Sequence, residues 1–267
     1  MPTLVGCRRR GFTPEGFKLL VDRVGVSKSD SWIDYAVLED CMREHLNEVA
    51  PRRIAVLDPL KLVIDNWPAG HVEECFAPNH PQKPDLGKRP IPMSSELWIE
   101  REDFMEVPAK GYFRLFPGNQ VRLKYGFVVR CTGYSKGADG IVSEVHCDYL
   151  PETKSGTTGA DAVKVKGTIH WVSAAQAYAT DVRLYDRLFN VPNPGKRTGN
   201  YLDDVNPAAK TIAKAFLEPS LKEAKPEDRF QFERHGYFVA DRKDSNPGAP
   251  VFNRAVTLRD SWASTAK

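Results

Sequence analysis

The sequence lacks long apolar runs and paired cysteines. No stretch approaches the roughly 18 apolar residues of a membrane helix, and the first ten residues lack the apolar core of a signal peptide. The five cysteines are an odd number, widely spaced and without a Cys-x-x-Cys pair. We therefore expect no membrane anchor, no disulfide framework and no zinc or other metal site. We expect the protein to be located in the reducing cytoplasm.

Motifs for catalysis are equally scarce. Neither a Walker A sequence nor a Gly-x-Gly-x-x-Gly fingerprint occurs. His170 lies among Ser173, Asp181 and Asp186, which could form a hydrolytic triad, but no Gly-x-Ser-x-Gly elbow accompanies them. His71-Val-Glu73 matches part of a deaminase signature without the Pro-Cys-x-x-Cys that completes it. A hydrolase therefore stays only as an alternative, which loss of activity in Ser173→Ala would support.

What the chain does contain is grouped positive charge. Its 267 residues suggest one to two domains, and 41% hydrophobic residues suffice for real cores. The formal net charge is only +3, yet cationic residues cluster at Arg8–Arg10, Arg52–Arg53, Lys88–Arg89, Arg122 with Lys124, and Lys196–Arg197. Such local stripes suit a polyanion, although solvated surface faces would look the same.

The hydrophobic pattern changes after Pro51. Before it, Thr13-Pro14 predicts the start of a helix that ends at Gly25, and apolar residues at helical spacing predict a second helix from about Ser31. After it, period-two runs and turn residues predict short strands, including a hairpin that pairs Tyr125–Cys131 with Ile141–Cys147. A short helix is predicted over Pro207–Phe216.

These elements predict a mainly β fold: a small α-helical module followed by two antiparallel β-barrels. We expect the helical module at residues 1–50, the first barrel region at 51–155 and the second at 156–267, with the C-terminal strands able to return to the first.

Lys110–Tyr125 alternates aromatic and cationic residues on either side of a Pro117-Gly118 turn. Single-stranded RNA is held by stacking on aromatic rings and by hydrogen bonds to base edges, so this segment suits a base-binding hairpin. An ordinary amphipathic hairpin with Phe113 and Leu115 facing the core explains the same spacing, and both interpretations stay open at this point.

Four further segments carry a resemblance over almost the entire chain: Lys164–Ala175, Val182–Phe189 with the Pro192–Gly195 turn, Gln231–Phe238 and Asn253–Trp262. The chain resembles the carboxy-terminal half of bacterial-type glutaminyl-tRNA synthetase. The His-x-Gly-His motif and the Lys-Met-Ser-Lys-type loop of that class are both missing, and Met1-Pro-Thr looks like an interior point of the family sequence. The resemblance implies an anticodon-binding portion without its catalytic domain, and a barrel type shared with certain ribosomal proteins.

The resemblance also implies roles for single residues. Arg52 and Gln231 match the positions that read the middle anticodon base. Arg114 matches the position that reads the third base. Arg122, with Lys124 close by, matches the position at the pocket for the first base. Asn47 and Gln82 match positions near loop bases outside the triplet, whereas Arg234 and Arg259 are expected to contact phosphate or form structural ion pairs. The family often has polar or cationic side chains where Ala109, Gly111 and Phe113 stand.

We therefore expect a monomer that recognises the anticodon of tRNA(Gln), without membrane contact and without catalysis of its own. ATP and magnesium, which the parent ligase uses to attach glutamine, are expected only in the missing catalytic domain. The alternative is a free-standing β-barrel RNA-binding module of ribosomal-protein type, which would be indifferent to the anticodon.

Overall fold

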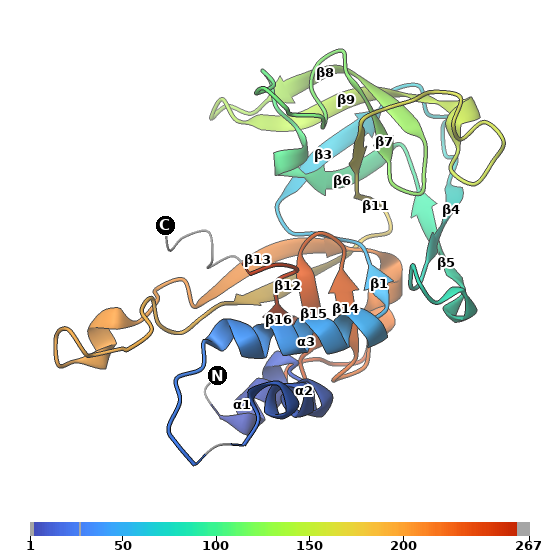
Figure 1. The fold of residues 1–267 in the computed structure, drawn as a ribbon. Helices are drawn as coiled ribbons and strands as arrows, with labels where there is room; N and C mark the ends of the chain where they lie inside the picture. Colours follow the sequence, from blue (N-terminus) through green and yellow to red (C-terminus); the bar gives the residue numbers. More distant parts are fainter. Residues whose placement is uncertain (1–2, 27, 261–267) are drawn as a thin grey trace. The chain divides into compact units, whose positions relative to one another are not determined.

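The computed structural model describes residues 3–26 and 28–260 and divides the chain into two compact units (Figure 1). The first unit comprises Met1–Arg53, Asp181–Ala213 and Lys222–Lys267, and the second comprises Ile54–Thr180 and Lys214–Leu221. Ser261 and Trp262, the end of the last resemblance segment, lie outside the described residues. Each unit is described by itself.

Three helices open the first unit: α1 (Leu4–Arg10), α2 (Pro14–Val24) and α3 (Tyr35–Val49). The predicted start of α2 is confirmed, because Pro14 is its first residue and the Thr13 hydroxyl accepts a hydrogen bond from the Gly16 amide at 3.1 Å. Gly25, with φ of 74°, ends it. The second predicted helix is also present, but it begins at Tyr35 behind an Asp34 cap rather than near Ser31.

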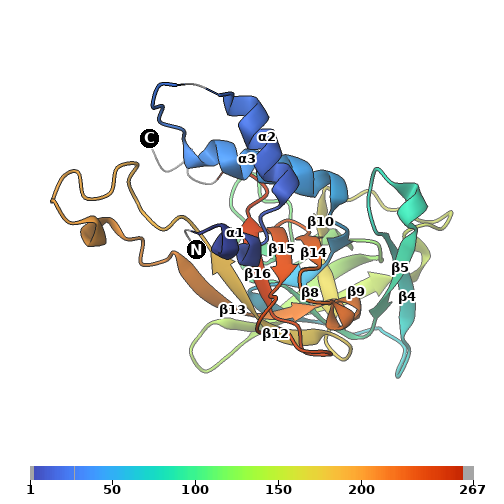
Figure 2. The ribbon, with the colours of Figure 1, turned by 90° about the horizontal axis from the view of Figure 1, so that it is seen from below.

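A seven-stranded sheet in the order β1-β14-β15-β16-β12-β13-β2 includes the strands of the first unit. The strands of this sheet are β1 (Arg52–Arg53), β2 (Ala55–Val56), β12 (Tyr178–Tyr185), β13 (Lys210–Leu217), β14 (Arg229–Phe232), β15 (Gly236–Ala240) and β16 (Phe252–Val256). The helices lie next to β15 and β16 (Figure 2). Phe12, Met42 and Leu46 pack there against Tyr237 and Ala255. This apolar contact anchors the helical module on the sheet.

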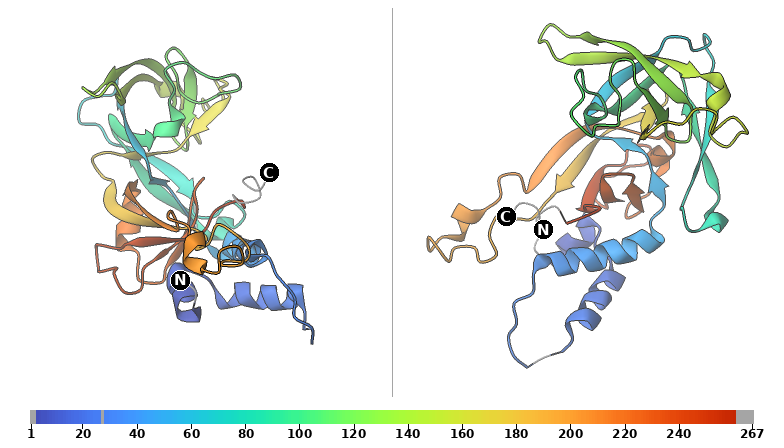
Figure 3. Two further views of the ribbon diagram at one scale, coloured as in Figure 1. Left: turned by 90° about the vertical axis from the view of Figure 1, so that its left-hand side faces the viewer. Right: turned by 45° about the horizontal axis from the view of Figure 1, so that its top comes forward.

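The second unit is built on a seven-stranded sheet in the order β10-β7-β8-β9-β3-β6-β11. Its strands are β3 (Pro59–Ile64), β6 (Glu96–Glu100), β7 (Gln120–Leu123), β8 (Val128–Lys136), β9 (Val142–Leu150), β10 (Gly167–Ile169) and β11 (Trp171–Ser173), and β4 (Glu73–Pro78) pairs separately with β5 (Lys88–Met93). The two outer strands, β10 and β11, are separated in sequence only by His170. Chain continuity therefore brings the sheet edges together, and the sheet curves into a nearly closed barrel (Figure 3).

Five 3₁₀ turns complete the described elements: η1 (Pro84–Leu86), η2 (Arg101–Asp103), η3 (Pro151–Thr153), η4 (Tyr201–Asp204) and η5 (Pro219–Glu223). Among the described residues, no helix is both long enough and apolar enough to cross a membrane. All five cysteines are free thiols.

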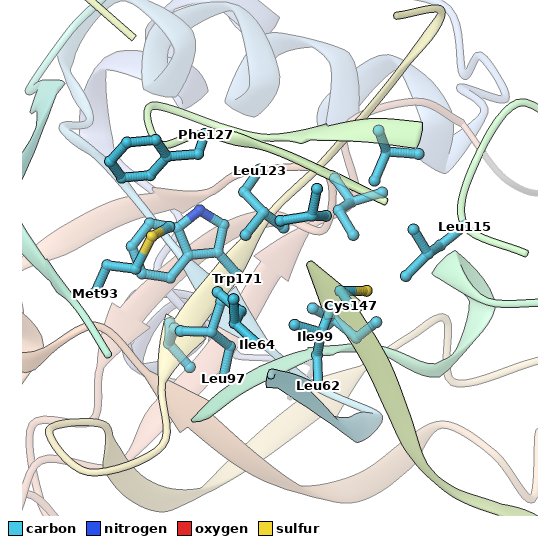
Figure 4. Close-up of a cluster of buried hydrophobic side chains, with 14 of the residues drawn as sticks. Leu62, Ile64, Met93, Leu97, Ile99, Leu115, Leu123, Phe127, Cys147 and Trp171 are labelled. Atoms are coloured by element: carbon cyan, nitrogen blue, oxygen red, sulfur yellow. The ribbon is translucent and has the colours of Figure 1, made fainter. Parts of the chain in front are cut away.

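Trp171 lies in the core of the second unit, fully buried beside Ile64, Met93, Leu123 and Phe127 (Figure 4). Its indole Nε1 donates to the carbonyl oxygen of Lys124 at 3.0 Å, so its one polar atom is satisfied. The interpretation of Trp171 as a barrel anchor is confirmed.

The predicted fold class and hairpin are confirmed: two barrel-like sheets follow a helical module, and Cys131 pairs with Cys147 across β8 and β9. The helix predicted over Pro207–Phe216 is wrong, because residues 210–217 form β13. The sheets also divide the chain differently from the expected ranges. β10 and β11 lie in the sheet that contains β3 and β9, so residue 155 is not a boundary between sheets.

Candidate nucleic-acid interface

Arg52 is the centre of a polar cluster at the end of α3. Pro51 ends the helix, and Arg52 then begins β1, where it is only 7% exposed. Its Nη1 donates to the carbonyl oxygens of Asn47 at 2.9 Å and Ala50 at 2.7 Å, and its Nη2 donates to Asn47 Oδ1 at 2.8 Å. The guanidinium therefore satisfies the last carbonyls of the helix and is held in a fixed plane.

Gln231 faces Arg52 from the neighbouring strand. β1 and β14 are parallel, with Arg52 paired with Gln231, and the backbone N–H of Gln231 donates to the Pro51 carbonyl at 2.9 Å. Within the part of the chain that the structure describes, the buried Oε1 of Gln231 has no hydrogen-bond partner. A buried acceptor without a partner costs about 1–3 kcal/mol. An incoming N–H donor, such as a base edge presents, would remove that cost.

Tyr237 completes this cluster from β15. Its hydroxyl donates to Asn47 Oδ1 at 3.2 Å, so Asn47 receives bonds from both Tyr237 and Arg52. Burial raises the pKa of Tyr237, which keeps the phenol neutral. Burial also lowers the pKa of Arg52, partly offset by Tyr237 and nearby carboxylates. The cluster thus holds a cation in a partly desolvated setting, where hydrogen bonds to it are stronger than in water.

The other two candidates of this unit lie elsewhere on the strands. Arg234 occupies the turn between β14 and β15 with φ of 71°. Arg259 follows β16 and is exposed, and its carbonyl accepts a hydrogen bond from Thr257 Oγ1 at 2.6 Å.

In the second unit, Arg114 lines an open hollow of about 550 Å³. Its Nη1 lies 2.8 Å from a Glu102 carboxylate oxygen and 2.9 Å from one of Asp103, whose side chain is fully buried. Two acidic partners therefore fix the guanidinium and balance its charge. For the segment Lys110–Tyr125, one interpretation places the side chains of Phe113 and Leu115 in the core. Leu115 is buried, as that interpretation expects, but Phe113 is 53% exposed.

Arg122 and Lys124 come from β7 and its end. Arg122 donates to the Thr153 carbonyl at 2.9 Å, to Ser155 Oγ at 3.3 Å and to the Ala160 carbonyl. Arg122 therefore holds the segment from Thr153 to Ala160 against the end of β7. Lys124 Nζ lies 5.1 Å from the centroid of the Tyr125 ring, which is a cation–π distance.

Gln82 is exposed in the segment between β4 and β5, and its amide nitrogen donates to Nδ1 of the buried His80 at 3.2 Å. The structure thus brings Asn47, Arg52 and Gln231 together, and it places Arg114, Arg122, Lys124 and Gln82 on separate parts of the second unit.

Sequence reasoning missed several residues around these candidates: Glu102, Asp103, Tyr112, Lys166, Thr168 and Tyr237. Lys166 and Thr168 alternate with the buried Gly167, and this period-two pattern is the sequence signal that places both side chains on the exposed face of β10.

The possible triad around His170 is not assembled. Ser173 is buried, and its hydroxyl pairs with Ser94 Oγ at 2.7 Å and donates to Gln176 Oε1. The buried His170 instead has its Nε2 3.5 Å from a Glu100 oxygen. The site therefore lacks a nucleophile that is exposed and bonded to a base.

Two family models, both described as "tRNA synthetases class I (E and Q), anti-codon binding domain", match residues 50–150 and 168–241. The glutamine–tRNA ligase of Cupriavidus necator is 68% identical over 98% of this chain, that of Ralstonia nicotianae 64%, and that of Nitrosomonas europaea 57%. The chain spans 45–47% of the length of these relatives. Since the two matches together cover well over half of its residues, the chain belongs to the anticodon-binding family of the class I (E and Q) tRNA synthetases.

Proposed function

We propose that this chain binds tRNA(Gln) and reads its anticodon as the C-terminal part of a glutamine–tRNA ligase. The family match and the names of the relatives support this proposal. The single structural observation that carries it is the buried Oε1 of Gln231, which has no hydrogen-bond partner among the described residues, on the residue that pairs with the fixed Arg52 in the strand register. A guanidinium and an amide together offer donors and an acceptor to a base edge.

In this proposal Arg52 and Gln231 bind the middle anticodon base, and Arg114 binds the third. Lys124 supplies the charge at the first base, while Arg122 shapes that pocket through the loop that it clamps. The remaining four residues act outside the triplet: Asn47 and Gln82 near neighbouring loop bases, and Arg234 and Arg259 at phosphates or in structural ion pairs.

The activity of the whole ligase belongs to the proposal as well. In a longer protein, ATP and magnesium would drive the attachment of glutamine in segments outside this sequence, and this chain would contribute recognition without chemistry. We expect it to act as a monomer in the cytoplasm.

The test compares two variants on two RNAs. Arg52→Lys keeps the charge but loses the planar fork, so it should weaken binding to native tRNA(Gln) more than binding to a transcript with a changed middle base. The exposed Arg130 pairs only with Asp148 at 3.5 Å in the described residues, so Arg130→Ala serves as the control and should leave the ratio of the two affinities unchanged. Equal binding of both RNAs by the wild type would instead favour the ribosomal-type module.

A further inference from the structure

The hollow beside Arg114 contains an exposed aromatic ring next to a lysine. Phe113 is 53% exposed, and Lys166 Nζ lies 5.3 Å from the centroid of its ring. Both residues line the hollow, together with Thr168. The volume of the hollow, about 550 Å³, lies within the range of about 300–1,000 Å³ that is typical of small-molecule sites.

The backbone around this ring is closely packed. A Cβ added to Gly167 would lie 1.9 Å from the Phe113 carbonyl oxygen, so the start of β10 touches the Phe113 backbone and only glycine fits there. The Tyr112 hydroxyl donates to the Glu102 carbonyl at 3.0 Å, and the Leu115 amide donates to the Asp103 carbonyl at 2.9 Å. The ring is therefore carried on a fixed backbone, although about half of its surface is exposed.

The two cations of the hollow differ in their partners. Arg114 is balanced by Glu102 and Asp103. For Lys166, by contrast, no carboxylate lies within ion-pair distance among residues 3–26 and 28–260, and its ammonium is exposed above the Phe113 ring. The hollow thus offers an uncompensated positive charge, a fixed guanidinium and an aromatic face. A phosphate, a base edge and a base plane are the complementary groups of one nucleotide.

We infer that Phe113 stacks on one unstacked nucleobase of the anticodon and that Lys166 contacts the phosphate adjoining it, so that both residues determine binding at the Arg114 site. This inference rests on the proposed function and identifies the bound group as the third-base nucleotide. Since Phe113 has no polar atom, its contribution is independent of base identity, whereas Arg114 supplies the hydrogen bonds that distinguish bases.

The test uses native tRNA(Gln) and the same RNA with an abasic ribose at the third anticodon position. Phe113→Leu should weaken binding of native RNA by roughly 5- to 150-fold, the range that stacking on one base accounts for, and leave binding of the abasic RNA nearly unaffected. Phe113→Tyr, which keeps the ring, should retain affinity. An equal loss on both RNAs, or no loss on either, would overturn the stacking role.

Lys166 is tested by salt dependence. Lys166→Gln should reduce the steepness of the plot of log affinity against log salt concentration by about 0.7 on both RNAs, which is the value for one lost phosphate contact to a single strand. Lys166→Arg should restore the steeper dependence. Lys164, exposed but outside the hollow, gives the matched control Lys164→Gln, for which no such change is expected. An unchanged slope in Lys166→Gln would overturn the phosphate contact. Discrimination of the middle base by the wild type, measured alongside, separates failure of this inference from failure of the proposed function.

Discussion

Replacing Gln231 with Met should stabilise the free protein and at the same time weaken its binding to tRNA(Gln). Met has nearly the length of Gln but no carbonyl oxygen, so the substitution removes the buried Oε1 that lacks a partner in the described residues. A side chain with a purely structural role would change stability and binding in the same direction.

The size of both effects follows from the same atom. Leaving a buried acceptor without a partner costs about 1–3 kcal/mol, so removing it should raise the free energy of unfolding by at least about 1 kcal/mol. In a protein of this size, that gain raises the Tm by about 2–4 °C. In the complex the acceptor would be paired, so its loss should weaken binding by roughly 5- to 150-fold.

Thermal unfolding and a binding titration on the same preparations measure the two effects. Gln176→Met is the matched control, because Gln176 Oε1 accepts the hydroxyl of the buried Ser173. That substitution should lower stability by about 0.5–1.5 kcal/mol and leave RNA affinity unchanged. A lower Tm for Gln231→Met than for the wild type, or unchanged affinity, would refute the interpretation of Oε1 as a ligand acceptor.

Three other predictions concern buried ionisable groups. Glu218 forms a bidentate ion pair with Arg89, with N–O distances of 2.6 and 2.7 Å, and both side chains are buried. Glu218→Gln should therefore lower the free energy of unfolding by about 3–5 kcal/mol, as measured by chemical denaturation. A loss below about 1 kcal/mol would contradict this expectation. Burial acts to raise the pKa of Asp241, but hydrogen bonds from Arg9, Asn253 and backbone amides lower it overall. The ionised Asp241 therefore contributes fully to the free energy of unfolding above the unfolded pKa of about 3.9, and this contribution is lost as the pH falls through the lower pKa of the folded state. Asp241→Asn should remove this loss and so flatten the acid limb of the stability–pH curve. Burial raises the pKa of Cys75 to about 12, so Cys75 should resist alkylation at pH 8. The half-buried Cys7 should react before Cys75, and peptide mass spectrometry would show the order of the two reactions.

Local signals in the sequence located the elements that local chemistry determines. Thr13, Pro14 and Gly25 predicted both ends of α2 correctly, and the period-two runs predicted the pairing of β8 with β9. Residues 210–217 show where such signals fail. Ala and Lys favour a helix there, but Phe216 and Leu217 pair with Val56 and Ala55 of β2, which lie far away in the sequence. Long-range pairing therefore overrode local propensity.

At the candidate site, too, some features could be predicted from the sequence, whereas others depend on contacts between distant segments. The resemblance supplied Arg52 and Gln231 as partners, and the strand register confirms that they face each other, while their reading of a base stays a prediction. The contacts of Arg122 could not be predicted from sequence, because they depend on how the loop from Thr153 to Ala160 folds back onto β7. The hollow around Phe113 likewise forms only when β10 approaches it.

The most direct test of the account is the affinity of the wild-type chain for tRNA(Gln) and for the same transcript with only its middle anticodon base changed, measured at two salt concentrations. Since one unmade buried pairing costs about 1–3 kcal/mol, we expect binding of the altered transcript to be roughly 5- to 150-fold weaker at both salt concentrations. Equal affinities that fall together with rising salt would show only phosphate attraction and would contradict anticodon reading.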